Sequence, residues 1–201
     1  AIPTGIGAIF NVAKPKANQS IAVFGIGGVG LCAVAGAKIA GCSPIIAVDI
    51  KKEKLDLAGK MGASHCINAS SNDPVEEIHK ICTNGLDFAV ECSGLTKVMQ
   101  QAILSARNQG GSAVIVGNAP FGEKLVIDPK QFNLGKSILG TWGGDNNPDI
   151  DFLKYIELVS SGKLNLEIMT QDIYKLDEVN DSIDDLEKSK AIRPLIDMGL
   201  K

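Results

Sequence analysis

The clearest chemical signal in the sequence is a glycine-rich loop, Gly25-Ile26-Gly27-Gly28-Val29-Gly30. It follows a short apolar run and precedes a stretch of small residues, which predicts a strand, a tight turn and a helix. In such a turn Gly25 allows the bend, Gly27 lets the backbone approach a diphosphate, and Gly30 lets the helix pack near the strand. The helix N-terminus then offers free N–H groups and a partial positive charge to phosphate oxygens. The loop therefore predicts a dinucleotide site.

An acidic residue completes this pattern. Asp49 ends the second apolar run, about 20 residues beyond the loop, where a carboxylate reaches the adenine ribose of a dinucleotide. A carboxylate accepts both ribose hydroxyls and repels a 2′-phosphate, so the sequence favours NAD over NADP. Lys51, Lys52 and Lys54 follow, and one of them could soften that repulsion. The alternative interpretation is a glycine-rich turn with an unrelated, solvated Asp49.

A methyltransferase that uses S-adenosylmethionine is the competing enzyme class, because it also combines a glycine loop with an acid after the second strand. The third glycine, Gly30, and the small residues of the following helix favour a dinucleotide instead.

Two further turns belong at the same edge of a parallel sheet. Residues 92–94 (Cys-Ser-Gly) end the fourth apolar run and residues 116–118 (Val-Gly-Asn) end the fifth. Ligands of open α/β sheets bind at the carboxyl ends of the strands, so these turns are expected near the ribose and nicotinamide. Glu91, one position before Cys92, is expected to point to the other face of the sheet. A hydrogen-bonded structural carboxylate is at least as good an interpretation of Glu91 as a role in cofactor binding.

Apolar runs alternate with amphipathic stretches along most of the chain. Runs that are apolar on both faces are typical of parallel strands covered by helices on both sides. The expected fold class is α/β with a doubly wound parallel sheet, the Rossmann arrangement. Strands are expected at residues 20–24, 45–50, 65–68, 87–92, 112–117 and 137–141, and helices at 1–16, 28–40, 51–61, 73–82, 96–108 and 149–160, with Asp73 and Thr96 as caps and Pro15 closing the first helix.

The last part of the chain departs from this alternation. It is expected to hold an extended stretch at 166–174, an acidic helix at 176–188 capped by Asp177, and an edge strand at 192–198. This tail has too little apolar mass for a core of its own, so it should dock onto another part of the protein. The domain boundaries are set at 1–17 for a linking helix, 18–160 for the dinucleotide-binding domain and 161–201 for the C-terminal segment.

Composition excludes several other classes of protein. Of the 201 residues, 45% are hydrophobic and 21% charged, and the net charge is −3, which suits a globular domain and gives no cationic surplus for nucleic acid. The apolar stretches stop well short of the ~20 residues of a membrane span. Five cysteines without a CxxC pair indicate free thiols in a reducing compartment, so a cytoplasmic location is expected.

The loop, its acid and several other stretches resemble the medium-chain dehydrogenase/reductase family, most of all its zinc-dependent alcohol dehydrogenases. The matching stretches are residues 3–8, 22–31, 46–50, 86–94 and 191–196. The resemblance implies that the chain is the coenzyme-binding domain plus the C-terminal segment that normally packs on a catalytic domain, which lies upstream in the family and is absent here.

The resemblance also implies which residues contact the coenzyme. The diphosphate would be held by Gly25, Gly27, Gly28, Val29, Gly30 and Arg193. The adenosine would be held by Asp49, Ile50 and Lys54, the nicotinamide ribose by Cys92 and Ser93, and the carboxamide by Val116 and Asn118. For Arg193 the alternative is a surface ion pair. Residues 141–144 fall where the family has a turn beside the nicotinamide, and Trp142 could pack there.

The implied activity is hydride transfer between NAD and a primary or secondary alcohol, aldehyde or ketone. The catalytic zinc ligands of the family lie mostly upstream, and His65 and His79 lack ligand spacing to any cysteine. We therefore expect no metal site and no catalytic residue here, and NAD binding without activity by this chain alone. A stand-alone nucleotide-binding module and a zinc-independent reductase of the same family remain alternatives. A homo-oligomer through residues 124–127 and 137–141, paired as a hairpin across a two-fold axis, is also implied.

Overall fold

The computed structural model describes residues 1–199, so the last two residues of the C-terminal segment predicted at 161–201 lie outside the described residues. The chain divides into two compact units, Ala1–Tyr155 and Ile156–Lys201.

The first unit is built on one parallel sheet of six strands. The strands are β1 (Ile21–Phe24), β2 (Ile45–Asp49), β3 (His65–Asn68), β4 (Phe88–Glu91), β5 (Ser112–Ile115) and β6 (Ser137–Gly140). Their order in the sheet is β3-β2-β1-β4-β5-β6, so the order reverses between β1 and β4. This confirms the doubly wound parallel sheet predicted from the sequence and places a ligand crevice at that reversal.

The strand register brings the predicted ligand-binding turns level with one another. Phe24 is the partner of Val48 on one side and of Glu91 on the other, and Glu91 is also the partner of Ile115. The residues that follow β1, β2, β4 and β5 therefore leave the sheet along one edge.

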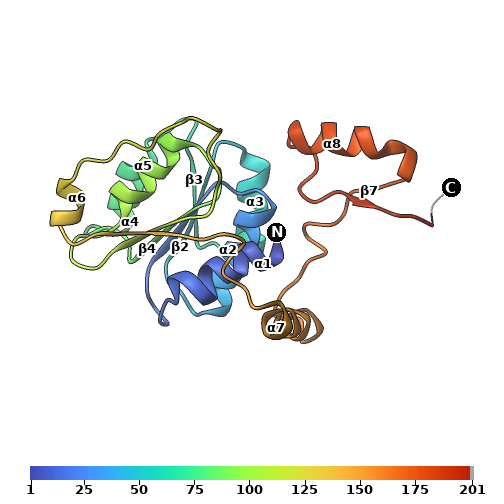
Figure 1. The fold of residues 1–201 in the computed structure, drawn as a ribbon, viewed down its shortest axis with the longest axis horizontal. Coiled ribbons are helices and arrows are strands. Elements are labelled where there is room, and N and C mark those ends of the chain that lie inside the picture. Colours follow the sequence, from blue (N-terminus) through green and yellow to red (C-terminus); the bar gives the residue numbers. More distant parts are fainter. Residues whose placement is uncertain (200–201) are drawn as a thin grey trace. The chain divides into compact units, whose positions relative to one another are not determined.

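Helices cover both faces of this sheet. Helix α2 packs against α1 and α3, and α4 packs against α5, with the sheet between the two groups (Figure 1). Their bounds are α1 Ile2–Gly7, α2 Gly28–Ile39, α3 Lys52–Met61, α4 Pro74–Ile81 and α5 Thr96–Ser105, and a π-helical turn η1 (Ala8–Ala13) continues α1.

The structure confirms two of the predicted helix ends and corrects two others. Asp73 caps α4 by accepting the Val75 and Glu76 N–H groups, and Gly62 ends α3 with a φ of +125°. Thr96 was expected to cap the helix after β4, but the cap is Leu95, and Thr96 is the first helical residue. The N-terminal helical stretch ends at Ala13, because Lys14 adopts a left-handed conformation before Pro15 is reached.

The core is continuous through the inner strands and thins at the edges. Phe24, Ile46 and Ala89 are fully buried, as expected for strands with helices on both faces. The expectation that the third run is apolar on both faces is wrong, because His65 and Cys66 at the start of edge strand β3 are exposed.

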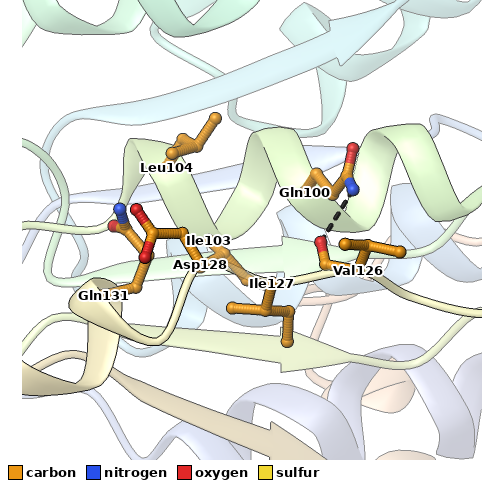
Figure 2. A pocket seen from close by; sticks show the side chains of 7 residues that line it. All are labelled: Gln100, Ile103, Leu104, Val126, Ile127, Asp128 and Gln131. Atoms are coloured by element: carbon orange, nitrogen blue, oxygen red, sulfur yellow. Dashed lines mark hydrogen bonds between the residues drawn. The ribbon is translucent and has the colours of Figure 1, made fainter.

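The predicted hairpin partner of β6 is not a strand. Residues 124–127 run beside α5, where the Gln100 Nε2 donates to the Val126 carbonyl oxygen at 2.8 Å (Figure 2). A cavity of about 210 Å³ lies along this contact. In the single chain Leu125 and Ile127 pack on the core, and the predicted contact of residues 124–127 with a second copy stays a prediction. A short helix, α6 (Lys130–Asn133), precedes β6, and α7 (Pro148–Ser160) follows it.

The second unit contains little regular structure. Its elements after α7 are β7 (Ile173–Tyr174), η2 (Leu176–Glu178), α8 (Val179–Glu187) and β8 (Leu195–Ile196), with β7 and β8 paired in parallel. The extended stretch expected at 166–174 is confined to β7, since Glu167–Met169 form a turn, and the strand expected at 192–198 is confined to β8. The prediction that Asp177 caps this helix is wrong. At this helix start the Glu178 carboxylate accepts the Lys175 N–H at 2.8 Å.

None of the helices in the described part of the chain is long and apolar enough to cross a membrane.

Candidate nucleotide-binding site

The loop between β1 and α2 is folded so tightly that two of its glycines cannot be replaced without rearrangement. Gly25 has a φ of +85°, and a Cβ there would lie 2.8 Å from the Ser93 nitrogen. A Cβ on Gly30 would lie 2.0 Å from the Gly25 carbonyl oxygen. Gly25 is thus required for the turn and its contact with the strand-β4 turn, and Gly30 for the close approach of helix to loop.

Gly27 differs from both of them. A Cβ at this position would meet nothing within 4 Å, and its φ of −88° and ψ of −167° are open to any residue. The protein's own packing therefore does not explain a glycine here. The open side of Gly27 is a cradle that a side chain would fill, which fits the close approach of a diphosphate predicted for this position.

The same position begins helix α2. Gly27 is its N-cap, no side chain of the described residues caps it, and the Leu31 N–H makes the first bond back to the Gly27 carbonyl. The N–H groups of Gly28, Val29 and Gly30 precede that bond, and the first N–H groups of a helix have no acceptor within it. They supply donors and the positive end of the helix dipole to an anion.

Asp49 ties the loop to the end of β2, a role that the sequence analysis did not foresee. Its Oδ2 accepts the Ile26 N–H at 2.6 Å and its Oδ1 accepts the Lys51 N–H at 2.9 Å. An ionised carboxylate has about four lone-pair positions, so each oxygen retains capacity for a ribose hydroxyl. The Asp49 carboxylate is therefore held in one orientation and still has acceptor positions free of these two bonds.

A cleft of about 200 Å³ opens beside this carboxylate. It brings together residues predicted from the sequence, namely Gly25, Asp49, Ile50, Lys54 and Ser93. Its other lining residues, which the sequence analysis missed, are Phe24, Val48, Ala69, Leu95, Val98 and Gln101. Ile50 is 60% and Leu95 56% exposed, and most of the remaining lining is apolar as well. An apolar cleft beside a carboxylate suits a flat heterocycle joined to a sugar.

The turns after β4 and β5 meet beside the start of the loop, where the β4 turn contacts Gly25. The Glu91 Oε1 accepts the Ser93 N–H at 2.6 Å and the Gly94 N–H at 2.9 Å, and the Glu91 carbonyl accepts the Val116 N–H at 2.9 Å. A Cβ on Gly94 would lie 2.4 Å from the Asn118 oxygen. Ser93, Val116 and Asn118 are thus grouped as predicted, and Glu91 is a structural carboxylate between them.

Cys92 is held beneath this turn as a neutral thiol. Burial, followed by the nearby Glu91 and Cys32, raises the pKa of the Cys92 thiol far above its ordinary value. A thiol with a raised pKa is a poor nucleophile, so no reactive role is assigned to Cys92.

Two predicted contacts with the coenzyme are not tested by this geometry. Arg193 lies in the second unit, and its diphosphate contact stays a prediction. Trp142 is 84% exposed in a turn fixed by Thr141, whose hydroxyl bonds to Asp145 at 2.6 Å.

Metal ligation finds no support in residues 1–199, which contain no group of three or more His, Cys, Asp and Glu side chains that could hold an ion. Each histidine ring has a local partner instead: the His65 Nδ1 lies 3.0 Å from the Ser64 hydroxyl, and the His79 Nδ1 lies 2.7 Å from the Val75 carbonyl.

Comparison with known proteins identifies the family to which the chain belongs. The family model described as zinc-binding dehydrogenase matches residues 28–161. The chain belongs to the zinc-binding dehydrogenase family. The sheet and its loop are the coenzyme-binding domain of that family, and membership implies a nicotinamide coenzyme, NAD or NADP.

Individual relatives agree with this assignment. The class-P alcohol dehydrogenase of Arabidopsis thaliana is 36% identical over 200 residues, which are 98% of this chain and 53% of that protein. The crystal structure of benzyl alcohol dehydrogenase from Acinetobacter calcoaceticus superposes with a TM-score of 0.94 at 34% identity, over 97% of this chain and 54% of that one.

A zinc-binding dehydrogenase from Sinorhizobium meliloti 1021, solved with bound NADP, superposes with a TM-score of 0.87 at 28% identity, over 96% of this chain and 57% of that one. The chain thus spans about half the length of the relatives that it matches.

Proposed function

We propose that this chain binds NAD(H) and is the coenzyme-binding part of an alcohol dehydrogenase-like oxidoreductase. The observation that carries the proposal is the cradle at Gly27, left open beside the uncapped N-terminus of α2. When bound, the nicotinamide coenzyme accepts or donates the hydride. The chain's own part is to bind and orient it.

Each end of the cleft has a distinct task in this proposal. The N–H groups of Gly28, Val29 and Gly30 hold the diphosphate at the start of α2. Asp49 accepts the adenine ribose hydroxyls while Ile50 and Lys54 border the adenosine. Cys92 and Ser93 border the nicotinamide ribose, and the backbone at Val116 and Asn118 meets the carboxamide.

The choice of NAD over NADP rests on Asp49. Its two oxygens already bond to backbone N–H groups, which hold the carboxylate in place so that it cannot turn away from a 2′-phosphate. The NADP bound by the Sinorhizobium meliloti relative makes this choice worth testing. Asp49→Asn should weaken NADH binding about tenfold, which is the effect of losing a charged hydrogen bond. It should also reduce the difference in affinity between NADH and NADPH. Equal binding of both coenzymes by the unaltered chain would contradict the NAD preference.

The rest of the reaction is assigned to residues outside this chain. We propose that the catalytic zinc and the alcohol or carbonyl substrate are held there, because the relatives are about twice as long and residues 1–199 offer no cluster of metal ligands. On this proposal the chain alone binds coenzyme without turning over alcohols. Arg193 is proposed to add a guanidinium to the diphosphate, and residues 124–127 and 137–141 are proposed to contact a second copy.

A pair of glycine substitutions tests coenzyme binding separately from folding. Gly27→Ala adds a methyl group to open space, so thermal unfolding should stay unchanged while NADH affinity, measured by calorimetry, falls at least tenfold. Gly59→Ala is the matched control, since a Cβ there also meets nothing within 4 Å but lies on α3 at an exposed position. It should leave NADH affinity unchanged. The proposal is overturned if the folded, unaltered chain gives no binding heat with NADH or NADPH.

A further inference from the structure

We propose that a polar cavity at the amino ends of strands β4, β5 and β6 binds the phosphate group of a small molecule. The cavity measures about 580 Å³ and is bordered by three basic side chains, His79, Arg107 and Lys136. It lies at the edge of the sheet opposite to the loop at residues 25–30, so the proposal does not depend on the proposed coenzyme function.

Segments that are far apart in the sequence form this cavity. Thr83 and Asn84 precede β4, residues 106–109 precede β5, and Lys136 directly precedes β6. His79 comes from the last turn of α4. These segments meet because parallel strands begin at the same edge of a sheet. The volume of the cavity lies within the range of small-molecule sites, roughly 300–1,000 Å³.

Lys136 gives the strongest indication of an anion. Its side chain is half-buried, and its Nζ donates to the carbonyl oxygens of Ile103 at 3.0 Å and Leu104 at 3.1 Å. An ammonium has three N–H groups, so one is left over. Burial lowers the pKa of Lys136, and no carboxylate among residues 1–199 forms an ion pair with it. An anion beside a half-buried cation offsets the cost of its burial.

Arg107 is held in place and also has donors left over. Its Nε donates to Asp87 at 2.9 Å and its Nη1 donates to the carbonyls of Asn108 and Gln109. The two N–H groups of its Nη2 have no partner in the described part of the chain. Asp87 balances the charge of Arg107, so Lys136 leaves the cavity with a net positive charge. Donors that the protein already holds in position bind a ligand with a smaller loss of conformational entropy.

The neutral lining groups indicate a phosphate as the anion. No Asp or Glu lines the cavity. Besides Ala106, the lining contains a hydroxyl and three amides whose side chains have no hydrogen-bond partner within residues 1–199: Thr83, Asn84, Asn108 and Gln109. A phosphate group has three strong acceptor oxygens and takes charge-assisted bonds from arginine and lysine. It can therefore use the basic and the neutral donors together, and the cavity has room for the organic part of a phosphate monoester.

Glycerol 3-phosphate is the probe for this site, and glycerol is its uncharged control. Calorimetry with the unaltered chain should give binding heat with glycerol 3-phosphate and none with glycerol. The start of α2 is the competing phosphate site, so the same affinity is expected in Gly27→Ala and in the presence of saturating NADH. No binding heat with glycerol 3-phosphate, or loss of that heat in Gly27→Ala, would overturn the proposal. A chain that binds glycerol 3-phosphate but no nicotinamide coenzyme contradicts the proposed function alone.

Asn108→Asp tests the location of the phosphate without removing a contact. The exposed Asn108 side chain makes no hydrogen bond within residues 1–199, so thermal unfolding should stay unchanged. Repulsion from the new carboxylate should weaken glycerol 3-phosphate binding about tenfold. Asn180→Asp is the matched control, since Asn180 is also exposed but lies on α8 and does not line the cavity. It should leave the affinity unchanged. Equal affinity in Asn108→Asp and the unaltered chain would contradict the proposed location.

Lys136→Gln provides a second, independent variant. It removes the charge that has no carboxylate partner, so glycerol 3-phosphate should bind about tenfold more weakly, which is the effect of losing a charged hydrogen bond. NADH affinity should stay unchanged because the coenzyme cleft lies at the opposite edge of the sheet. If folded Lys136→Gln binds glycerol 3-phosphate as tightly as the unaltered chain, Lys136 does not hold the phosphate and the proposal fails.

Discussion

The two edges of the sheet use buried or half-buried carboxylates in opposite ways. At the amino edge, Asp87 accepts the Ser20 N–H and hydroxyl, each at 2.9 Å, and the Arg107 Nε at 2.9 Å. At the carboxyl edge, Asp49 and Glu91 accept backbone N–H groups and one hydroxyl, and neither has an ion-pair partner among residues 1–199.

This difference separates stability from coenzyme binding. At the amino edge the Asp87 carboxylate also accepts the Gln19 Nε2 at 3.3 Å, so groups of the protein use all of its lone-pair positions. At the carboxyl edge the uncapped start of α2, the open side of Gly27 and the free lone pair of Ser93 are left for a ligand. Donors and acceptors left without a protein partner at the carboxyl edge, in contrast to the fully bonded Asp87, are what a ligand site requires.

The largest effect is expected from Gly30→Ala. Its Cβ would lie 2.0 Å from the Gly25 carbonyl oxygen and 3.0 Å from the Gly25 carbonyl carbon, so backbone must move. Forcing a methyl group into such a space costs about 3 kcal/mol, and the loop would no longer present its N–H groups to a diphosphate. Urea unfolding and NADH calorimetry should therefore both report losses. If Gly30→Ala unfolds at the same urea concentration as the unaltered chain, the helix and the loop are not packed as closely at Gly30 as the structure shows.

A smaller effect, confined to stability, is expected from Asp87→Asn. The substitution removes the charge from the Arg107 pair and weakens the bonds from Ser20. The carboxylate is partly solvated, with 21% of its side chain exposed, so solvent screening limits the loss of unfolding free energy to about 1–2 kcal/mol. NADH affinity should stay unchanged because the residue lies at the far edge. A matching loss of NADH affinity would break the separation between the two edges.

The part of the fold that the sequence predicted well is the part with a strict local pattern. The six parallel strands and the loop at residues 25–30 follow from apolar runs and from glycines with fixed geometric roles. The Asp73 cap also followed, because its carboxylate precedes Pro74 at the start of a helix.

Predictions failed where tertiary contacts decide between similar local signals. Thr96 and Leu95 compete for one cap position, and the sequence alone favours the hydroxyl, yet the turn anchored by Glu91 starts the helix at Thr96. Residues 124–127 were predicted as one arm of a hairpin in a homo-oligomer, and in the single chain they lie beside α5, outside the sheet. The hydrogen bonds from the Ile26 N–H to Asp49 and from the Ser93 N–H to Glu91 depend on the folded positions of the turns. The spacing of these residues in the sequence does not predict them.

The smallest expected effect is the pH dependence of the amino edge. Burial alone would raise the pKa of Asp87, but the hydrogen bonds from Ser20 and Arg107 hold it below its usual value. A carboxyl group with a lowered pKa in the folded state stabilises the protein fully above its unfolded pKa, about 4. That stabilisation is lost as the pH falls through the lower, folded pKa. Urea unfolding of the unaltered chain and of Asp87→Asn should therefore differ by a constant amount above pH 5.

Below pH 4 that difference should shrink towards zero, because protonation makes Asp87 resemble the neutral amide. Asp151, whose pKa is lowered by the Asn147 N–H and then by Lys154, is present in both proteins and cancels in the comparison. A difference that grows as the pH falls would mean that Asp87 is not stabilised as an anion by Ser20 and Arg107. The contrast between a saturated carboxylate at the amino edge and an open carboxyl edge would then lose its electrostatic basis.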